Sequence, residues 1–196
     1  MTVPAACTDS PGSEPTSNPT QATAEPTTSP DESPTGSPSP TSDTDIAAAG
    51  AEAVLREYLT LSNDLRTDTS RPLDELEEVA TGLELDSQSK FLTDWREKGW
   101  QATGEARLVE LDLVDVSLDN SDPDAGKVPT VTMEACVDVT GSDVVDSDGD
   151  SVIEPSRADR TWTRYLVSNY RWDDDPSDSW RVASSETLER ESCDAA

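Results

Sequence analysis

The sequence contains no histidine. Histidine is the commonest general base, the commonest metal ligand and the side chain that ordinarily titrates near neutral pH. Its absence argues against acid–base catalysis and a zinc site. The sequence also has no glycine-rich phosphate motif, Cys/His metal cluster or nucleophile elbow. We therefore expect a protein that is not an enzyme and that needs no cofactor.

Positive charge is scarce. Lys and Arg total 14 against 42 Asp and Glu, which gives a net charge of -28. Nucleic-acid phosphates and anionic membrane surfaces would repel such a protein, so neither is an expected partner. No apolar run approaches the roughly 20 residues that span a bilayer. Attachment to a membrane would therefore need a lipid.

Apolar side chains other than alanine are missing from residues 8–45, which are rich in Pro, Ser and Thr. Seven acidic residues and no Lys or Arg occur in residues 1–45. A segment with so little to bury does not recover the entropy cost of folding. We expect residues 1–45 to be a disordered acidic tether, either a semi-stiff spacer or an O-glycosylated stalk. A disordered cytoplasmic tail is the alternative.

Cys7 follows the small residues Ala5 and Ala6 and precedes this polar segment. The arrangement resembles a bacterial lipoprotein processing site, although Pro4 stands where such sites carry Leu or a similar residue. The charged and apolar parts of a signal peptide are missing, so we expect the true start to lie upstream of Met1. Lipidation of Cys7 would anchor the protein to the outer face of the cell membrane. An incidental cysteine is the alternative.

The first helix is predicted over residues 46–66, after a cap supplied by Asp43, Thr44 or Asp45. Its apolar residues recur at helical spacing and would form one buried face. They are Ile46, Ala49, Ala53, Leu55, Tyr58, Leu61 and Leu65.

Two more helices are expected before residue 100. A short one begins near Pro72, which suits a first helical position, and ends at Gly82. The next covers residues 87–98 and places Phe91 and Trp95 on one face.

Beyond Gly104 the apolar residues occur at every second position, which predicts strands. The first strand covers residues 105–118, and a shift of its apolar phase predicts a β-bulge near Leu113. Three further strands are predicted over residues 131–139, 160–172 and 179–188.

Helices followed by long antiparallel strands indicate an α+β domain over residues 46–196, with N-terminal helices packed on a curved sheet. This order resembles the cone-shaped NTF2-like fold. Several turn and strand motifs resemble a family of actinobacterial lipoproteins of unknown function with such a domain. The likeness covers about residues 46–193 and implies a fold but no activity. Its motifs are Val79–Gly82, Gly99–Gly104, Cys136–Gly141, Val144–Gly149, Arg157–Arg160 and Trp180–Val182.

Cys136 and Cys193 are expected to form a disulfide, since two thiols of an exported domain usually pair. The bond would hold the C-terminal segment against the sheet and contribute about 4 kcal/mol through loop entropy. Two free buried thiols are the alternative. No histidine is present to activate a catalytic cysteine.

Four carboxylates lie around Gly149 at nearly alternate positions, a spacing that calcium ligands can have. The match to an EF-hand loop fails, because Val144 and Pro155 would occupy ligand positions. A polar hairpin tip with its turn at Asp148-Gly149 is the favoured interpretation, and weak Ca²⁺ binding is the alternative. The four residues are Asp143, Asp146, Asp148 and Asp150.

Other acidic and aromatic residues are open to two interpretations. The strand carboxylates are expected to face solvent, as the polar half of an alternating strand. The alternative is that they line a pocket, where one can act as a base. The five tryptophans are expected in the core, or else one or two line a groove for sugars or peptides. The carboxylates are Asp112, Asp115, Glu134 and Asp138; the tryptophans are Trp95, Trp100, Trp162, Trp172 and Trp180.

The leading hypothesis is a non-enzymatic lipoprotein whose domain binds a peptide, a cell-wall component or a protein. One alternative is a small enzyme or small-molecule carrier that uses the cone cavity, which an open cavity with a buried carboxylate would favour. Another is a structural part of a secretion or conjugation assembly, which an exposed sheet edge would favour.

Overall fold

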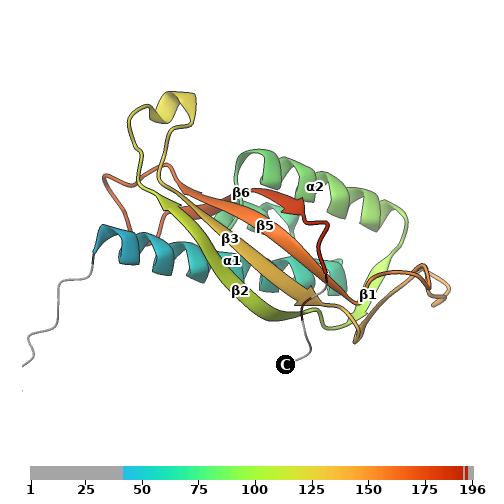
Figure 1. The fold of residues 1–196 in the computed structure, drawn as a ribbon. Helices are drawn as coiled ribbons and strands as arrows, with labels where there is room; N and C mark the ends of the chain where they lie inside the picture. The colour runs from blue at the N-terminus through green and yellow to red at the C-terminus, as the bar shows by residue number, and fades with distance from the viewer. Residues whose placement is uncertain (1–41, 192, 194–196) are drawn as a thin grey trace, which may run out of the picture. The chain divides into compact units, whose positions relative to one another are not determined.

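A computed structural model describes residues 42–191 and 193 and shows an α+β architecture (Figure 1). Cys7 and the predicted tether up to residue 41 lie outside the described residues. The helical segments are α1 (Asp43–Thr67), the 3-10 helix η1 (Leu73–Glu78), α2 (Gly82–Glu97) and the 3-10 helix η2 (Pro123–Ala125). The strands are β1 (Gln101–Gly104), β2 (Arg107–Ser117), β3 (Thr130–Asp138), β4 (Ser142–Val145), β5 (Arg160–Asn169) and β6 (Trp180–Thr187).

Helix α1 begins three residues before the predicted start at Ile46, because Ser42 rather than a later residue is its cap. The Ser42 hydroxyl accepts a hydrogen bond from the backbone N–H of Asp45 at 3.1 Å. The Asp45 carboxylate accepts one in return from the Ser42 backbone N–H at 3.1 Å. This reciprocal capping box satisfies two backbone donors that a helix start leaves unpaired.

The buried face of α1 is only partly the predicted one. Leu55, Tyr58 and Leu65 are buried as expected, whereas Ala49 and Ala53 are exposed. Alanine fits both a core and a surface, so it marks the face of a helix weakly. The buried residues are Ala47, Ala51, Val54, Leu55, Tyr58, Ser62 and Leu65.

Gly82 starts a helix and does not end one. The predicted second helix is the short η1, and α2 begins at Gly82, five residues before the predicted start at Ser87. Gly82 has a φ of +54°, which glycine adopts without strain and which turns the chain between the two segments. Leu92 and Trp95 of α2 are buried, while Phe91 is 41% exposed.

The main sheet is antiparallel, with strand order β2-β3-β5-β6. Its four strands correspond to the four predicted ones. The predicted bulge is confirmed, since the register of β2 against β3 shifts between Leu113 and Asp115, and it shifts again between Leu108 and Glu110. On β2, which lies at an edge of the sheet, Leu113 and Val114 are exposed.

A second, two-stranded sheet was not predicted. In it β1 pairs with β4, from Gln101 opposite Val145 to Gly104 opposite Ser142. Each strand is only four residues long and shows little alternation, so its pattern resembles that of a loop. Val144 and Ala102 nevertheless pack with Trp95 in a small cluster of their own.

Helix α1 covers the inner face of the main sheet, and the largest apolar cluster lies between them. Inner-face residues alternate along β3 and β5, as Val131, Met133 and Ala135 do on β3. Helix α2 contacts β6 and η1 and covers a second cluster at the other end of α1 (Figure 1).

We predict that Gly50→Ala destabilises the protein. A Cβ at residue 50 would lie 2.5 Å from both the Ser177 carbonyl oxygen and Cδ1 of Trp180. Trp180 is fully buried, so α1 would have to move outward, which typically costs about 1–3 kcal/mol. We expect a lower urea midpoint despite the better helix propensity of alanine. Gly141→Ala is the control, because its Cβ would meet nothing closer than 3.9 Å; equal midpoints for the two variants would contradict the prediction.

Candidate functional site: a groove between α1 and the sheet

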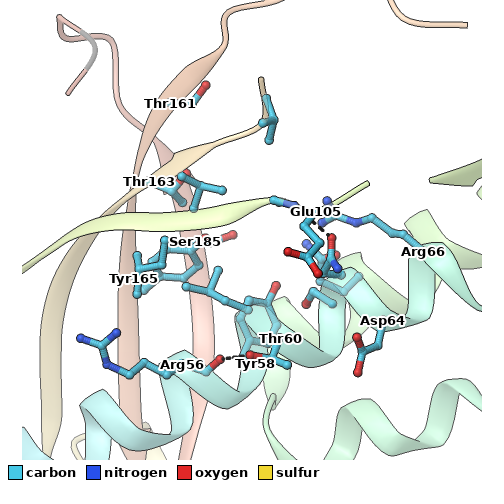
Figure 2. A pocket seen from close by; sticks show the side chains of 18 of the residues that line it. Arg56, Tyr58, Thr60, Asp64, Arg66, Glu105, Thr161, Thr163, Tyr165 and Ser185 are labelled. Carbon is cyan, nitrogen blue, oxygen red and sulfur yellow. Dashed lines mark hydrogen bonds between the residues drawn. The ribbon is translucent and has the colours of Figure 1, made fainter. Parts of the chain in front are cut away.

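An open groove of about 600 Å³ lies where α1 and the inner face of the sheet diverge. Figure 2 shows Tyr58 and Arg66 on the α1 side and Thr163, Tyr165 and Ser185 on the sheet side. A cavity of this size suits a small organic ligand. Its wall combines hydroxyl-bearing and aromatic side chains with a few charges.

The residues of each wall lie on one face because their spacing matches the repeat of the helix or of the strand. On α1 Tyr58, Ser62 and Arg66 are four residues apart and therefore lie on one face. On β5 Thr163 and Tyr165 are two apart and therefore share the inner face of the sheet. The bulge in β5–β6 pairing falls between Leu166 and Val167, just beyond this pair. The groove thus continues the same interface that holds the core.

Tyr58 connects the groove to a buried carboxylate. Its hydroxyl donates a hydrogen bond to the Glu84 carboxylate in the first turn of α2. Glu84 is only 2% exposed, and it lies behind Tyr58, outside the groove wall. Burial and the nearby Glu84 raise the pKa of Tyr58 well above its usual value. Burial also raises the pKa of Tyr165 to about 12, so both phenols stay protonated at neutral pH.

Several buried polar atoms of the groove lack a partner. In the part of the chain that the structure describes, five buried side-chain atoms make no hydrogen bond. Three of the five belong to groove residues: Ser62 Oγ, Arg66 Nε and Gln88 Oε1. Buried polar groups in native proteins are nearly always hydrogen-bonded. These three residues leave hydrogen-bonding capacity in the groove wall that no described residue uses.

The carboxylates of the groove are not placed for general-base catalysis. Asp64 forms an ion pair with Arg71 at 2.8 Å, and Glu105 is exposed. A carboxylic acid gains the basicity of a catalyst when it is buried in apolar surroundings. Neither of these two side chains has such surroundings.

None of the four predicted pocket carboxylates lines the groove. Glu134 and Asp138 stand on the outer face of β3, because they are out of phase with Val131, Met133 and Ala135. Asp112 and Asp115 are on the edge strand β2 and are exposed or half-buried. The pocket hypothesis for these residues is wrong, since the alternation of the strand directs them to the opposite side.

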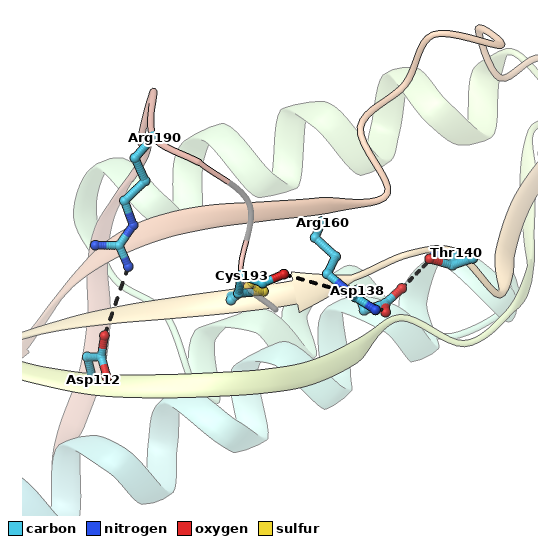
Figure 3. The surroundings of a disulfide bond; sticks show 7 residues. Asp112, Asp138, Thr140, Arg160, Arg190 and Cys193 are labelled. Atoms are coloured by element: carbon cyan, nitrogen blue, oxygen red, sulfur yellow. Dashed lines mark hydrogen bonds and ion pairs between the residues drawn. A yellow bond between two sulfur atoms is a disulfide. The ribbon is translucent and has the colours of Figure 1, made fainter. Parts of the chain in front are cut away.

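The outer face holds a network of charges around a disulfide (Figure 3). Cys136 and Cys193 form the predicted pair, with Cα atoms 6.3 Å apart. Glu134 is buried beneath two guanidinium groups, at 2.6 Å from Arg164 and 2.7 Å from Arg190. Because Glu134 accepts from both arginines, it is neither a solvent-facing residue nor an available base.

The C-terminal segment is held to this face by three kinds of contact. Besides the disulfide, Arg190 stacks over the Trp162 ring at 3.6 Å from its centroid. The Cys193 carbonyl oxygen accepts a hydrogen bond from Arg160 at 3.3 Å, and Arg160 also donates to Asp138 at 2.8 Å (Figure 3). These contacts hold the described part of the segment against β3 and β5.

The structure does not assemble the predicted calcium site. Asp146 Oδ1 accepts hydrogen bonds from the backbone N–H groups of Asp148 and Asp150, at 2.9 and 3.1 Å. Asp143 Oδ1 accepts one from the Ser151 hydroxyl at 2.7 Å. Within residues 42–191 and 193, no three His, Cys, Asp or Glu side chains converge on a point that could hold a metal ion. The loop is the favoured hairpin tip, with Gly149 at a φ of +86°.

The tryptophans pack as expected and do not line the groove. Trp180 is fully buried and meets Trp172 edge to face at 5.9 Å between centroids. Trp95 meets Trp100 in the same way at 5.6 Å. The aromatic walls of the groove are tyrosines instead.

Among the helices that the structure describes, none is both long and apolar enough to cross a bilayer.

No protein-family model matches the chain, and no curated protein matches it. Among solved structures, the intermembrane space region of the chloroplast protein ARC6 is similar, at 15% sequence identity and a TM-score of 0.48. The match covers 70% of this chain and 93% of that one.

Sequence analysis missed Ser62 and Arg66 as groove residues. Both follow Tyr58 at four-residue steps along the face that was predicted to be apolar. The signal in the sequence was a charged residue on the same helix face as the apolar residues. A long helix can extend beyond the apolar core that this face covers, and a charged residue on the face indicates where it does so.

We predict that Tyr58→Phe destabilises the fold by about 1–3 kcal/mol, because it leaves the buried Glu84 carboxylate without its donor. Urea unfolding measures the change. Tyr170→Phe is the control, since Tyr170 is 54% exposed. Similar unfolding free energies for both variants would show that the contact with Glu84 contributes nothing.

We predict that Asp138 titrates far into the acid range. Hydrogen bonds from Thr140, followed by the contact with Arg160, lower the pKa of Asp138 to about 2. A depressed folded-state pKa stabilises the protein above the unfolded value near 4, and this stabilisation disappears as the pH falls toward 2. Carboxyl ¹³C NMR should place the midpoint well below that of an exposed aspartate, and Arg160→Gln should raise it. A midpoint near 4 in the unaltered protein contradicts the assignment.

Proposed function

We propose that this protein is an extracytoplasmic, lipid-anchored carrier or receptor that binds a small molecule in the groove between α1 and the sheet. Its domain would be of the NTF2-like type and would not be an enzyme. The observation that carries the proposal is the open groove of about 600 Å³, whose residues include three buried polar atoms without a partner among residues 42–191 and 193. A filled interior would have favoured a pure interaction domain instead.

The arrangement of helix and sheet supports an NTF2-like assignment. A long helix, α1, covers the inner face of an antiparallel sheet whose edge strand carries two register shifts. Bulges of this kind bend a strand and increase the local twist. A bent sheet that closes on a helix at one end and opens at the other leaves a cavity.

The absence of enzymatic activity is proposed from the chemistry of the groove. The sequence offers no histidine. The two buried carboxylates, Glu84 and Glu134, are both engaged by donors and neither lines the cavity. The protonated tyrosines can donate hydrogen bonds to a ligand but are poor bases at neutral pH.

Anchoring outside the cytoplasm is proposed from the sequence and from the cysteine pair. Cys7 would carry the lipid, and residues 1–45 would hold the domain away from the membrane. The bond between Cys136 and Cys193 suits an oxidising compartment. A role within a secretion or conjugation assembly is the second candidate, favoured by Leu113 and Val114, which are 52% and 50% exposed on the edge strand β2.

Fragment binding followed by ¹⁵N NMR tests the groove. The probe is a library of soluble fragments that includes neutral, acidic and basic compounds, added one at a time to the full chain. We expect the backbone signals of Ala106, Thr161 and Ser185, which line the groove, to shift with several fragments. Thr163→Trp should abolish these shifts because the indole would fill the cavity.

Leu166→Trp is the matched control, because Leu166 neighbours this region on β5 but is 39% exposed and does not line the groove. Ser185→Trp, on β6, is a second blocking variant in case Thr163→Trp does not fold. If no fragment shifts a groove signal, or if the blocked variants bind as the unaltered protein does, the carrier function is refuted.

A further inference from the structure

Arg66 is a half-buried cation that has no partner among the described residues. Its Nε atom makes no hydrogen bond, and its guanidinium forms no ion pair with any residue in 42–191 or 193. One face of the guanidinium is occupied, since Phe91 of α2 lies 5.6 Å away at its ring centroid. The Arg66 side chain lines the groove, and its guanidinium donates no hydrogen bond within the described residues.

Every other half-buried arginine among the described residues either pairs with a carboxylate or donates a hydrogen bond to a backbone carbonyl oxygen, so the lack of a partner at Arg66 is unusual. Arg56, which also lines the groove, is paired with Glu52 at 2.8 Å. On the outer face, Arg160 and Arg164 each meet a carboxylate at less than 3 Å. Burial lowers the pKa of Arg66, and no carboxylate counteracts this effect. An arginine nevertheless stays charged in proteins.

The charge and geometry of Arg66 indicate which kind of ligand would pair with its guanidinium. A guanidinium whose face is stacked presents parallel N–H donors, which match the two oxygens of a carboxylate. Asp64 and Glu105 also line the groove, and the net charge is -28, so a multiply charged anion would be repelled. Apolar side chains such as Leu59 and Leu108 complete the wall beside Tyr165. They can receive the hydrocarbon part of a ligand.

We propose that the groove binds a small organic acid with a single carboxylate, which forms its ion pair with Arg66 and places its apolar body between α1 and β5. This inference rests on the proposed carrier function and adds the chemical class of the ligand. Arg66 is the residue that determines specificity for an acid over a neutral analogue. The hydroxyls of Thr163 and Ser185 line the same cavity and offer further donors.

Paired titrations of acids and their amides test the inference. The probes are hexanoate, cyclohexanecarboxylate and 4-phenylbutyrate, each compared with its primary amide, which has nearly the same shape and no charge. Calorimetry or NMR titration of the full chain at pH 7 gives the affinities. We expect at least one acid to bind about tenfold or more tightly than its amide, as is typical of a hydrogen-bonded charge.

Three variants locate the effect. Arg66→Gln should remove the preference for the acid. It should leave the affinity for the amide within about twofold, a change in free energy smaller than the contribution of one hydrogen bond. Arg56→Gln is the matched control: it makes the same charge change in the same groove, at a guanidinium already paired with Glu52. Glu105→Gln should strengthen acid binding, because it removes a negative charge from the wall.

The outcomes separate this inference from the proposed function. Equal affinities for acids and amides, an unchanged preference in Arg66→Gln, or an equal loss in Arg56→Gln would each overturn the assignment of Arg66. Groove binding of neutral fragments would leave the carrier function intact in those cases. Failure of all three acids to bind below about 10 mM, while neutral fragments do bind, overturns the inference as well.

Discussion

The structure depends on the packing of α1 against the inner face of the four-stranded sheet. That contact buries the largest apolar cluster, and its close approach is possible because Gly50 carries no side chain where Trp180 and the Ser177 carbonyl meet the helix. The groove lies along the same interface, between α1 and the sheet. Gln88 of α2 and the residues Glu105 and Ala106, which precede β2, complete its wall.

The distribution of charge follows from the same packing. On the outer face, the few arginines neutralise carboxylates that the sheet brings close together, as Arg164 and Arg190 do for Glu134. Such a buried pair is costly to break, because removing one partner leaves an uncompensated charge. On the inner side Arg66 has no such carboxylate among residues 42–191 and 193. The two faces of one sheet thus differ in whether their arginines are neutralised, and the groove lies on the inner side.

Long elements with a strong period were predictable. The four main strands, the bulge near Leu113 and the cysteine pair were all found where the pattern placed them. Short or ambiguous elements were not. Gly82 is equally compatible with the end and the start of a helix, and the four-residue strands β1 and β4 carry almost no alternation. The acids along the strands did not indicate the candidate site, because the informative residue, Arg66, is a base on a helix.

The composition shows that this protein is highly acidic and has no histidine, and the local periods of its apolar residues indicate an α+β domain. These properties are sums over residues or local periods, so they do not depend on how the chain is arranged. It was the three-dimensional fold that decided which face of each strand is inward, whether Glu134 is accessible, and that Arg66 has no counter-ion within the part of the chain that the structure describes. Those properties depend on residues far apart in the chain, because the energy of a buried charge is set by its neighbours in space.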